Sequence, residues 1–237
     1  LNYGQFNDLC TAGASGLQAL GLKQGQCVSV FAENSYKWLV MDQSVMKTGA
    51  HNAVRGVAAP VDELNYIFDN SKSTGLIVEN EAMLDRLLSD PSWTAEPRFI
   101  IILWSSAKNP ATAKGSDLED KYFPKLVQQE RAYDLAGGGV HIGGDNNMKE
   151  TQVRDYKNNR PSIVYYDELI LNSHISEYIA QTSRSPQDTA TILYTSGTTA
   201  QPKGVVLQHR LVSTSPFNSS LPTFGPFSSL CIYMGSD

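Results

Sequence analysis

The chain has 237 residues, of which 41% are hydrophobic and 18% are charged, and its formal net charge is −5 at pH 7. This length allows one large domain or two small ones with a sizeable core, and the negative charge argues against nucleic acid or an anionic membrane as the main partner. No stretch reaches the roughly 18 apolar residues of a transmembrane segment. Peripheral association with a membrane stays open.

The N-terminus and the cysteines carry less information. The first ten residues lack the basic start and apolar core of a signal peptide, and the chain begins with Leu1 instead of methionine, so the true start and any targeting segment stay open. Cys10, Cys27 and Cys231 are widely separated and odd in number. Because this fits neither a disulfide framework nor a metal-binding spacing, we expect reduced thiols and no metal site.

The first hundred residues predict alternating helices and strands. Apolar residues at helical spacing predict the helices, and Gly21 is placed to end the first of them. The negative side chains that follow Pro60 suit the positive N-terminal end of another helix. In chain order we expect a helix with Phe6, Leu9, Gly13, Leu17 and Leu20 on one face, a strand over Cys27–Ala32, a helix with Trp38, Met41, Val45 and Gly49 on one face, a helix with Val61, Leu64, Ile67 and Phe68 as its buried stripe, a strand over Gly75–Val78, a helix over Glu81–Leu88 and a strand over Arg98–Trp104.

This alternation predicts an α/β fold, with a mostly parallel sheet flanked by helices. The run Arg98–Trp104 is apolar on both faces, as an inner parallel strand should be. After an irregular stretch, Ser162–Ile170 predicts a strand running into a helix, and Ala190–Tyr194 predicts a further strand.

Two segments depart from the regular pattern. Residues 108–160 show little periodicity, and Gly137–Gly144 invites a dinucleotide-loop interpretation. Its spacing does not fit G-x-G-x-x-G, no strand precedes it and no capped helix follows it, so we expect a flexible, loop-rich surface insertion. Residues 211–237 are rich in Ser, Pro, Phe and Gly, and three prolines break any helix or inner strand. Such a segment is either a loop-rich end of the domain or a disordered tail outside the fold, and we expect the second.

The stretch "ILYTSGTTAQPKGVVLQH" (Ile192–His209) has the chemistry of a phosphate-binding loop. Its hydroxyls can donate hydrogen bonds, Gly197 permits close approach of the backbone, and Lys203 adds a mobile positive charge. The preceding strand places the loop at a strand's end, where ligands of open α/β sheets gather. It is not a Walker loop, because the lysine precedes Gly204 instead of following a glycine. On composition alone, a Thr/Ser-rich turn with a solvated lysine explains the stretch equally well.

The order of its residues distinguishes these interpretations. "YTSGTTAQPKGV" closely resembles the [YF]-T-S-G-[ST]-T-G-x-P-K-G signature of the adenylate-forming acyl-activating (AMP-binding) enzymes, which include acyl-CoA synthetases, acyl-carrier-protein synthetases and luciferases. The segment "GAHNAVRG", followed by "VDELNYIFDNS", most resembles the plant and algal long-chain acyl-acyl-carrier-protein synthetases. The resemblance covers residues 3–107 and 162–207.

The resemblance implies that residues 1–210 are part of the large N-terminal domain of the adenylate-forming fold, and that the smaller C-terminal domain is absent. It also implies that ATP is bound with Mg²⁺, and that the acid is a long-chain fatty acid. In the family this acid forms an acyl-adenylate and pyrophosphate, and the acyl group then passes to the thiol of CoA or an acyl-carrier protein. A plastid location, or otherwise the cytoplasm, is implied as well. The residues that the resemblance assigns to the β- and γ-phosphates of ATP are Thr195, Ser196, Gly197, Thr198, Thr199 and Lys203, with Gly204 beside them.

The sequence departs from the family pattern in two respects. Ala200 stands where the signature has glycine, and if that position needs a left-handed backbone, alanine costs about 1–2 kcal/mol there. The adenine-binding motif Y-G-x-T-E and the ribose-binding motif Y-x-T-G-D do not occur. No residue of this stretch is an evident general base, and alignment with charge neutralisation would suffice for the half-reaction. We therefore expect a truncated fatty-acid-activating ligase that binds phosphate but is inactive alone.

Two other functions stay open at this point. One is a non-catalytic interaction module derived from the same family, and the other is an unrelated ATP-binding phosphotransferase. None of the four histidines forms a recognisable triad, so we expect them in ordinary surface or polar-core roles, with His209 a weak candidate for the acyl or nucleotide site. Trp38 and Trp104 are expected in the core. The histidines are His51, His141, His174 and His209.

Overall fold

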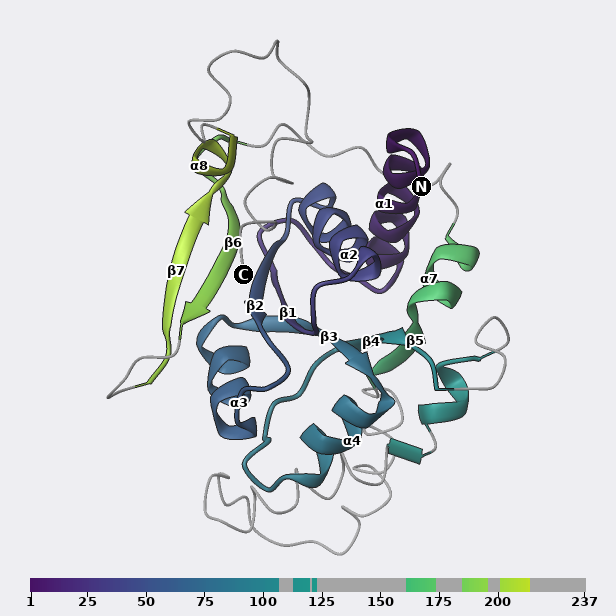
Figure 1. The fold of residues 1–237 in the computed structure, drawn as a ribbon, viewed down its shortest axis with the longest axis vertical. Helices are drawn as coiled ribbons and strands as arrows, with labels where there is room; N and C mark the ends of the chain where they lie inside the picture. The colour runs from purple at the N-terminus through teal and green to yellow at the C-terminus, as the bar shows by residue number, and fades with distance from the viewer. Residues whose placement is uncertain (107–112, 120, 123–160, 174–184, 196–200, 214–237) are drawn as a thin grey trace, which may run out of the picture.

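The computed structural model describes residues 1–106, 113–119, 121–122, 161–173, 185–195 and 201–213. They form a seven-stranded sheet with the strand order β5-β4-β3-β1-β2-β6-β7 (Figure 1). All neighbouring strands are parallel except β6 and β7, which are antiparallel. The elements are α1 (Tyr3–Ala19), β1 (Cys27–Phe31), α2 (Tyr36–Lys47), β2 (His51–Arg55), α3 (Val61–Asn70), β3 (Ser73–Asn80), α4 (Glu81–Ser89), β4 (Phe99–Trp104), β5 (Ser162–Tyr165), α7 (Tyr166–Asn172), β6 (Thr189–Thr195), β7 (Lys203–Gln208) and α8 (His209–Ser213).

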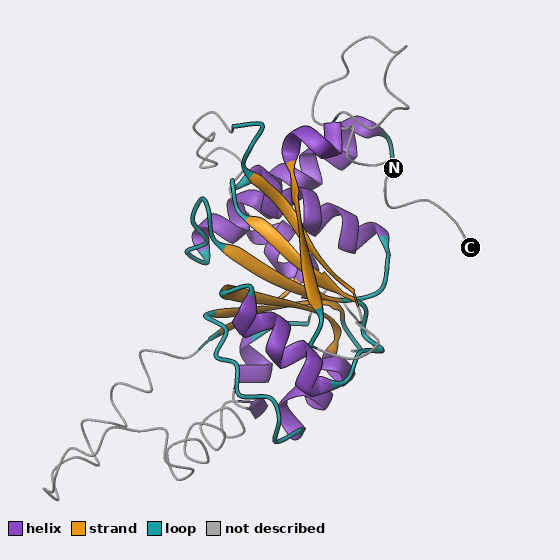
Figure 2. Cartoon of the chain, turned by 90° about the vertical axis from the view of Figure 1, so that its left-hand side faces the viewer, coloured by secondary structure: helices purple, strands orange, loops and turns teal. Residues whose placement is uncertain are grey.

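Helices cover both faces of the sheet, as Figure 2 shows. One hydrophobic cluster joins the sheet to α1, α2 and α7, and the other joins it to α3 and α4. We call these two sides the α1–α2 face and the α3–α4 face. The expected α/β fold with a mostly parallel sheet flanked by helices is therefore confirmed.

Strand β4 shows why the inner strands are apolar throughout. Successive side chains of a strand point to opposite faces, so a strand covered on both sides needs apolar residues at every position. Ile100 and Ile102 pack on the α3–α4 face, whereas Phe99, Ile101 and Leu103 pack on the α1–α2 face. All five side chains are buried, and each aliphatic one contributes about 1.5–3 kcal/mol of hydrophobic stabilisation.

Polar residues at the helix ends set where the helices begin and end. Asn2 caps α1 by accepting a hydrogen bond from the Gln5 N–H at 2.8 Å, and the Gln5 side chain accepts one from the Asn2 N–H at 2.9 Å. Ser35 caps α2 in the same way, with 3.1 Å between its Oγ and the Trp38 nitrogen. Such caps satisfy N–H groups that have no partner inside the helix. Gly21 follows the end of α1 with a φ of +88°, which confirms the stop predicted from the sequence.

Two expectations need correction, and one strand was missed. Strand β2 was not predicted, because its sequence "HNAVR" is mostly polar and does not alternate as a half-buried strand would. Gly49 does not lie on the buried face of α2, since the helix ends at Lys47 and Gly49 forms the turn after it with a φ of +76°. Trp104 is 38% exposed instead of lying in the core, because it is the last residue of β4, whereas Trp38 is 2% exposed as expected.

Parts of the two irregular segments are described. Within the expected insertion, Tyr122 is completely buried in the cluster on the α3–α4 face, and Gly115 lies against the backbone of Ile163 in β5. The first three residues of the expected tail complete α8. The glycine-rich stretch Gly137–Gly144 and residues 214–237 lie outside the described residues, and the domain division at residues 210 and 211 stays a prediction.

Candidate functional site

The predicted phosphate-binding loop joins β6 to β7. Thr195 is the last residue of β6, and Lys203 and Gly204 are the first two residues of β7. Ser196, Gly197, Thr198 and Thr199 lie outside the described residues, as does Ala200. The structure therefore places the two ends of the signature, and the assignment of its members to phosphate stays a prediction.

The loop lies at the carboxyl edge of the parallel strands. β6 runs parallel to β2, with Val54 opposite Leu193, so Thr195 emerges at the same edge of the sheet as the end of β2. Ligands of open α/β sheets bind at this edge. The sequence predicted the loop at a strand's end, and this placement is confirmed.

The strand that follows the loop was not predicted from the sequence. Lys203 lies in β7, with its Cα opposite that of Thr195. Directly opposite residues of an antiparallel pair project to the same face, so the hydroxyl and the ammonium project together beside the loop. Both residues are exposed, and no described residue forms an ion pair with Lys203. Neither group therefore has to break an ion pair with a described residue before it meets a polyanion.

Tyr194 holds this hairpin against the domain. Its side chain is buried on the α3–α4 face, and its hydroxyl donates a hydrogen bond of 2.7 Å to Asn70 Oδ1 at the end of α3. Burial raises the pKa of the Tyr194 hydroxyl to about 12, so it stays protonated and keeps donating. At the other end of the hairpin, the backbone N–H of His209 donates to the Asp188 carbonyl at 3.1 Å. The two anchors fix the strands that carry the loop.

Gly204 has a packing role that the sequence did not reveal. Its Cα lies opposite that of Tyr194, and a Cβ at this position would be 3.0 Å from Tyr194 Cζ and 3.0 Å from Ile192 Cγ2. The φ of Gly204 is not in the left-handed region. A side chain at this position is therefore restricted by the tyrosine ring and Ile192 beside it, and not by the backbone conformation.

We expect Gly204→Ala to lower the free energy of unfolding by about 1 kcal/mol, because the added methyl group presses on a ring that its hydrogen bond to Asn70 keeps in place. At an open position the same change would stabilise the protein by about 0.4–1 kcal/mol, because alanine lowers the conformational entropy of the unfolded chain. The sign of the measured change therefore distinguishes a crowded position from an open one. Urea denaturation measures the difference. In a Tyr194→Phe background, where the ring can shift, the loss should shrink; a stabilising Gly204→Ala would contradict the packing role.

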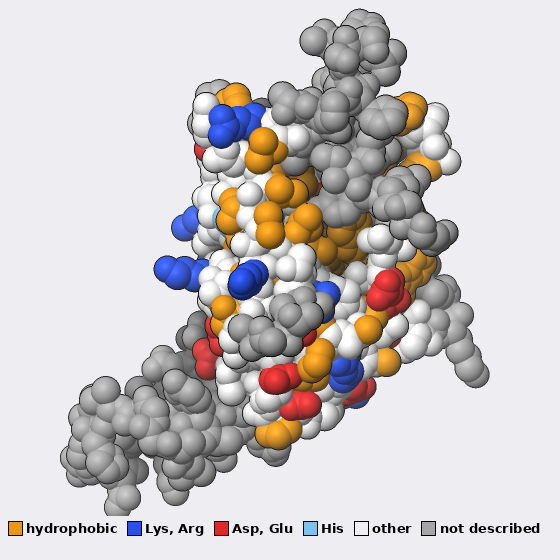
Figure 3. Space-filling view, turned by 60° about the vertical axis from the view of Figure 1, so that its left-hand side comes forward, with side chains coloured by type: hydrophobic (Ala, Val, Ile, Leu, Met, Phe, Trp, Pro, Cys, Tyr) orange, Lys and Arg blue, Asp and Glu red, His pale blue; other side chains and the backbone are white. Residues whose placement is uncertain are grey.

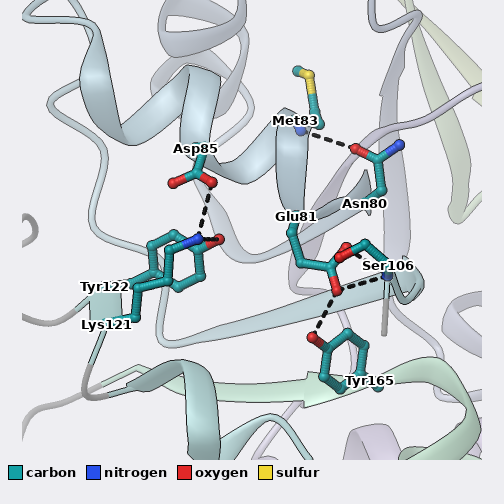
Figure 4. Close-up of polar contacts among 8 residues, drawn as sticks. All are labelled: Asn80, Glu81, Met83, Asp85, Ser106, Lys121, Tyr122 and Tyr165. Atoms are coloured by element: carbon teal, nitrogen blue, oxygen red, sulfur yellow. Dashed lines mark hydrogen bonds and ion pairs between the residues drawn. The ribbon is translucent and has the colours of Figure 1, made fainter. Parts of the chain in front are cut away.

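Two polar contacts near the carboxyl edge were not predicted. Arg55, at the end of β2, donates from Nε to Glu63 Oε1 at 2.6 Å and so ties that strand to the first turn of α3. Glu81, at the start of α4, accepts hydrogen bonds from the Ser106 N–H at 2.9 Å and the Tyr165 hydroxyl at 2.7 Å (Figure 4). Neither contact could be predicted from the sequence, because each depends on which side chains of different elements the fold brings together.

The Glu81 contacts keep its carboxylate charged. Burial by itself would raise the pKa of this carboxyl, but the hydrogen bonds from Ser106 and Tyr165 outweigh it and lower the pKa. The carboxylate joins the residues that leave β4 to the end of β5, so it ties together two neighbouring strands and α4. Its contacts with these described groups indicate a structural role.

The structure also bears on the cysteines and histidines. Cys10 and Cys27 are free and buried, as expected for reduced thiols, and Cys231 lies outside the described residues. Among the residues that the structure places, no group of three or more His, Cys, Asp or Glu could hold a metal ion. His51 is half-buried in β2, and burial lowers its pKa. His209 begins α8, and its place beside an acyl or nucleotide site stays a prediction; His141 and His174 lie outside the described part.

The family model for the AMP-binding enzymes matches residues 1–228. This range extends beyond residue 207, where the resemblance of the quoted motifs ends, and beyond residue 210, the predicted end of the family domain. Over 210 residues the chain is 31% identical to the long-chain-fatty-acid–[acyl-carrier-protein] ligase AEE15, chloroplastic, of Arabidopsis thaliana, covering 89% of this chain and 24% of that protein. Over 195 residues it is 34% identical to the probable acyl-activating enzyme 16, chloroplastic, of the same plant, covering 82% and 22%. The chain therefore spans less than a quarter of the length of both relatives.

Solved structures show the same fold. The anthranilate CoA ligase AuaEII in complex with anthranoyl-AMP superposes with a TM-score of 0.59 at 16% identity, covering 89% of this chain and 30% of that one. The N-terminal domain of FACL13 from Mycobacterium tuberculosis superposes with a TM-score of 0.55 at 18% identity, covering 94% and 42%. The described residues therefore have the architecture of an N-terminal adenylate-forming domain.

Proposed function

The chain belongs to the AMP-binding enzyme family, and on this basis we propose that it carries the N-terminal, ATP-phosphate-binding part of a ligase that activates a long-chain fatty acid. The observation that carries the proposal is the position of the signature residues, between β6 and β7 at the carboxyl edge of the sheet. Family membership gives adenylate formation as the chemistry, and the loop gives the place where the triphosphate would bind.

The residues of the loop fit a triphosphate. Thr195 and Lys203 are exposed on one face of the hairpin. The sequence of residues 196–199 contains further hydroxyls and backbone amides, which are the groups that donate hydrogen bonds to phosphate. Lys203 supplies a positive charge for the β- and γ-phosphates, and Mg²⁺ would arrive with these phosphates and offset their charge further. When ATP is bound, its α-phosphate is the electrophile that the fatty-acid carboxylate attacks, and pyrophosphate leaves. The chain's own contribution is to position and neutralise the leaving group.

The substrates follow from the relatives and not from the geometry. The relative AEE15 is a long-chain-fatty-acid–[acyl-carrier-protein] ligase, and the more distant relative ACSBG2 of mouse is a long-chain-fatty-acid–CoA ligase. We therefore infer a long-chain fatty acid as the acid, and an acyl-carrier protein or CoA as the thiol acceptor. Because both plant relatives are chloroplastic, we infer a plastid location. No described helix is both long and apolar enough to cross a membrane.

We further propose that the 237-residue chain is catalytically incomplete. The family motifs for adenine and ribose do not occur in it, and it covers only 24% of the AEE15 relative. A non-catalytic interaction module of the same family is the second candidate, and the exposed apolar side chains of β7 favour it. The two candidates differ in whether the chain binds ATP.

Calorimetric titration with Mg·ATP tests the phosphate site. We expect Lys203→Ala to weaken ATP binding about ten- to hundred-fold, because a charge-assisted hydrogen bond contributes about 1.5–3 kcal/mol. AMP lacks the β- and γ-phosphates, so its affinity should change much less. Lys23→Ala removes a lysine from the turn after α1 and serves as the matched control.

Two results would count against the proposal. Equal ATP affinities of Lys203→Ala and the unchanged chain would remove Lys203 from the phosphate site. Fatty-acid-dependent ATP–pyrophosphate exchange by the purified 237-residue chain would show that it is catalytically complete. If this exchange disappeared in Lys203→Ala, the phosphate site would be supported, and the proposal that the chain is catalytically incomplete would be wrong.

A further inference from the structure

Arg55 has hydrogen-bonding capacity that its contact with Glu63 does not use. A guanidinium has five N–H donors, of which one is on Nε and four are on the two terminal nitrogens. Arg55 Nε donates to Glu63 Oε1 at 2.6 Å, and no described residue accepts a hydrogen bond from the terminal nitrogens of Arg55. The side chain of Arg55 is 25% exposed, so it remains accessible to a ligand.

Arg55 lies beside the strand that carries the predicted phosphate-binding loop. β2 and β6 are parallel neighbours, with Val54 opposite Leu193. One residue further along both strands, Arg55 comes level with Tyr194, which immediately precedes Thr195. Neighbouring strands of a sheet are about 4.8 Å apart. The backbone of Arg55 is therefore one strand away from the start of the loop.

The contacts of α3 show that Arg55 points towards the carboxyl edge of the sheet. α3 follows β2 and precedes β3, so it begins at the carboxyl edge and ends at the amino edge. Arg55 contacts Glu63 in the first turn of α3, whereas the Tyr194 hydroxyl contacts Asn70, the last residue of this helix. The two side chains therefore lead to opposite ends of α3, and the guanidinium lies at the end where the loop emerges.

Arg55 and Lys203 reach this edge from opposite faces of the sheet. Successive side chains of a strand alternate between the two faces. Because Tyr194 is on the α3–α4 face, Thr195 and the directly opposite Lys203 project to the α1–α2 face. Arg55 lies on the α3–α4 face, where it meets Glu63. A phosphate group at the end of β6 can therefore meet a positive charge from each side.

A second arginine near this edge uses its terminal nitrogens within the protein. Arg86 of α4 donates from Nη1 to the Val57 carbonyl and from Nη2 to the Ala59 carbonyl, and so holds the turn between β2 and α3. Arg55 differs, since none of the described residues occupies its terminal nitrogens. The structural tie of Arg55 to α3 runs through Nε alone.

The surroundings of Arg55 are not broadly basic. Glu63 partly neutralises the guanidinium, and Glu33 is close, since its Oε1 would lie 3.7 Å from a Cβ on Gly56. Figure 3 brings this side of the molecule forward and shows positive and negative side chains close together on it. Binding of a phosphate group would therefore rest on hydrogen bonds to the guanidinium, and the two carboxylates favour a Mg²⁺ complex over the free anion.

We propose that Arg55 is a phosphate-binding residue, whose terminal nitrogens bind a phosphate group at the carboxyl edge while Glu63 holds the guanidinium through Nε. Arginine suits this task because two of its parallel N–H donors match two phosphate oxygens. The inference rests on the proposed function and adds to it a residue outside the signature. ATP and CoA both carry phosphate groups of this chemistry, and the test separates them.

Calorimetric titration of the chain and its variants with Mg·ATP, with AMP and with CoA tests the proposal. Arg55→Met should weaken binding of the ligand that it contacts about ten-fold, because a charge-assisted hydrogen bond is lost. Arg55→Lys should recover only part of this affinity, because an ammonium does not present two parallel donors. Arg98→Met makes the same change at an exposed arginine before β4, at the amino edge, and should leave every affinity unchanged.

Glu63→Gln separates phosphate binding from a purely structural role. Glutamine keeps a side-chain oxygen that accepts a hydrogen bond from Arg55 Nε, but it removes a negative charge near the ligand. The affinity of Glu63→Gln should therefore rise about two- to five-fold. If Arg55 only tied β2 to α3, neither Glu63→Gln nor Arg55→Met would change the affinity in this opposite manner. Circular dichroism and urea denaturation check that each variant is folded.

The results distinguish this proposal from the proposed function. Unchanged affinities of Arg55→Met for ATP, AMP and CoA would overturn it, as would equal losses in Arg55→Met and Glu63→Gln. A loss for Lys203→Ala without a loss for Arg55→Met would support the phosphate-binding loop and exclude Arg55. A loss for Arg55→Met alone would support Arg55 and exclude Lys203. If none of the three ligands bound to the unchanged chain, both proposals would be wrong.

Discussion

Asp167→Ala should lower the free energy of unfolding by about 3 kcal/mol, because it leaves the buried ammonium of Lys37 without its counter-charge. Lys37 is only 4% exposed, and its Nζ lies 2.8 Å from Asp167 Oδ2 and 3.0 Å from the carbonyl oxygen of Leu103. The Trp104 and Tyr166 rings lie 4.5 Å and 4.7 Å from the ammonium, measured to the ring centroids. This expected loss is at the low end of the range for a broken buried ion pair, because Asp167 is itself 35% exposed and water can partly replace its carboxylate.

Lys37→Met should have a smaller effect, about 1 kcal/mol, because it removes the charge while the apolar side chain still packs between the rings. The carboxylate it leaves behind can be hydrated. The double variant should resemble Lys37→Met alone, since Asp167 then has no buried charge to compensate. Urea denaturation of the four proteins measures the coupling free energy directly.

The exposed pair between Lys121 and Asp85 is a matched control, drawn in Figure 4. Its nitrogen–oxygen distance of 3.0 Å is similar, but its side chains are 50% and 39% exposed. Asp85→Ala should therefore change the free energy of unfolding by less than about 1 kcal/mol. If Asp85→Ala and Asp167→Ala had equal effects, burial of Lys37 would not be the cause.

Asp42→Asn should raise the free energy of unfolding at pH 7.5 by about 1–3 kcal/mol, because it removes a charge from the interior. Asp42 is 1% exposed, and burial raises the pKa of its carboxyl from 3.8 to about 6, although hydrogen bonds from Gln43 and Asn52 oppose the shift. The shift of about two pKa units corresponds to about 3 kcal/mol. Part of this is offset in the variant, because the Gln43 amide, 3.0 Å from Asp42 Oδ2, must rotate to meet an amide nitrogen.

The pH at which this effect appears follows from the direction of the shift. The folded protein binds the Asp42 proton more tightly than the unfolded chain does, so this carboxyl's contribution to stability is fully present below about pH 4. It is lost as the pH rises through about 6. Denaturation curves from pH 4 to 8 should therefore show the stability difference between Asp42→Asn and the unchanged chain growing with pH and levelling above about pH 6.

Asp42 interacts with groups of β2 and α1. Asn52 of β2 donates to Asp42 Oδ1 at 2.8 Å, and the Asp42 charge helps to raise the pKa of the neighbouring Cys10 thiol, in which burial is the main cause.

Asp8→Asn removes an exposed carboxylate from α1 and should change the stability by less than about 0.5 kcal/mol. A stability difference for Asp42→Asn that does not vary with pH would contradict a buried, titrating carboxyl.

Much of the fold could be predicted because its signals are local. The apolar run over Arg98–Trp104 predicted an inner parallel strand, and β4 is one. The position of Gly21 predicted where α1 ends. β2 was missed because the Asn52 amide donates to Asp42 and Arg55 pairs with Glu63, and these partners belong to other elements. Lys37 likewise has the sequence context of a solvated lysine near a helix start, and the structure shows it buried.

The candidate site, like the fold, could be predicted from the sequence only in part. The order of residues in "YTSGTTAQPKG" was sufficient to predict the family and to place the loop after a strand, because the hydroxyl, glycine and lysine residues of the signature are neighbours in the sequence. The antiparallel partner β7, the contact between Tyr194 and Asn70, and the packing reason for Gly204 were not predictable from it. Each depends on residues that are brought together only when the hairpin packs against α3.

The sequence by itself determined the family, the alternation of helices and strands, and the chemical character of the loop, since periodicity and motif order are properties of neighbouring residues. Only the tertiary structure decided which polar groups are buried and which strands pair with one another. Burial and strand pairing are set by contacts between elements far apart in the chain, such as Lys37 with Asp167 and β2 with β6. For this reason the family could be predicted from one short stretch, whereas the buried charges and the pairing of β7 with β6 required the folded molecule.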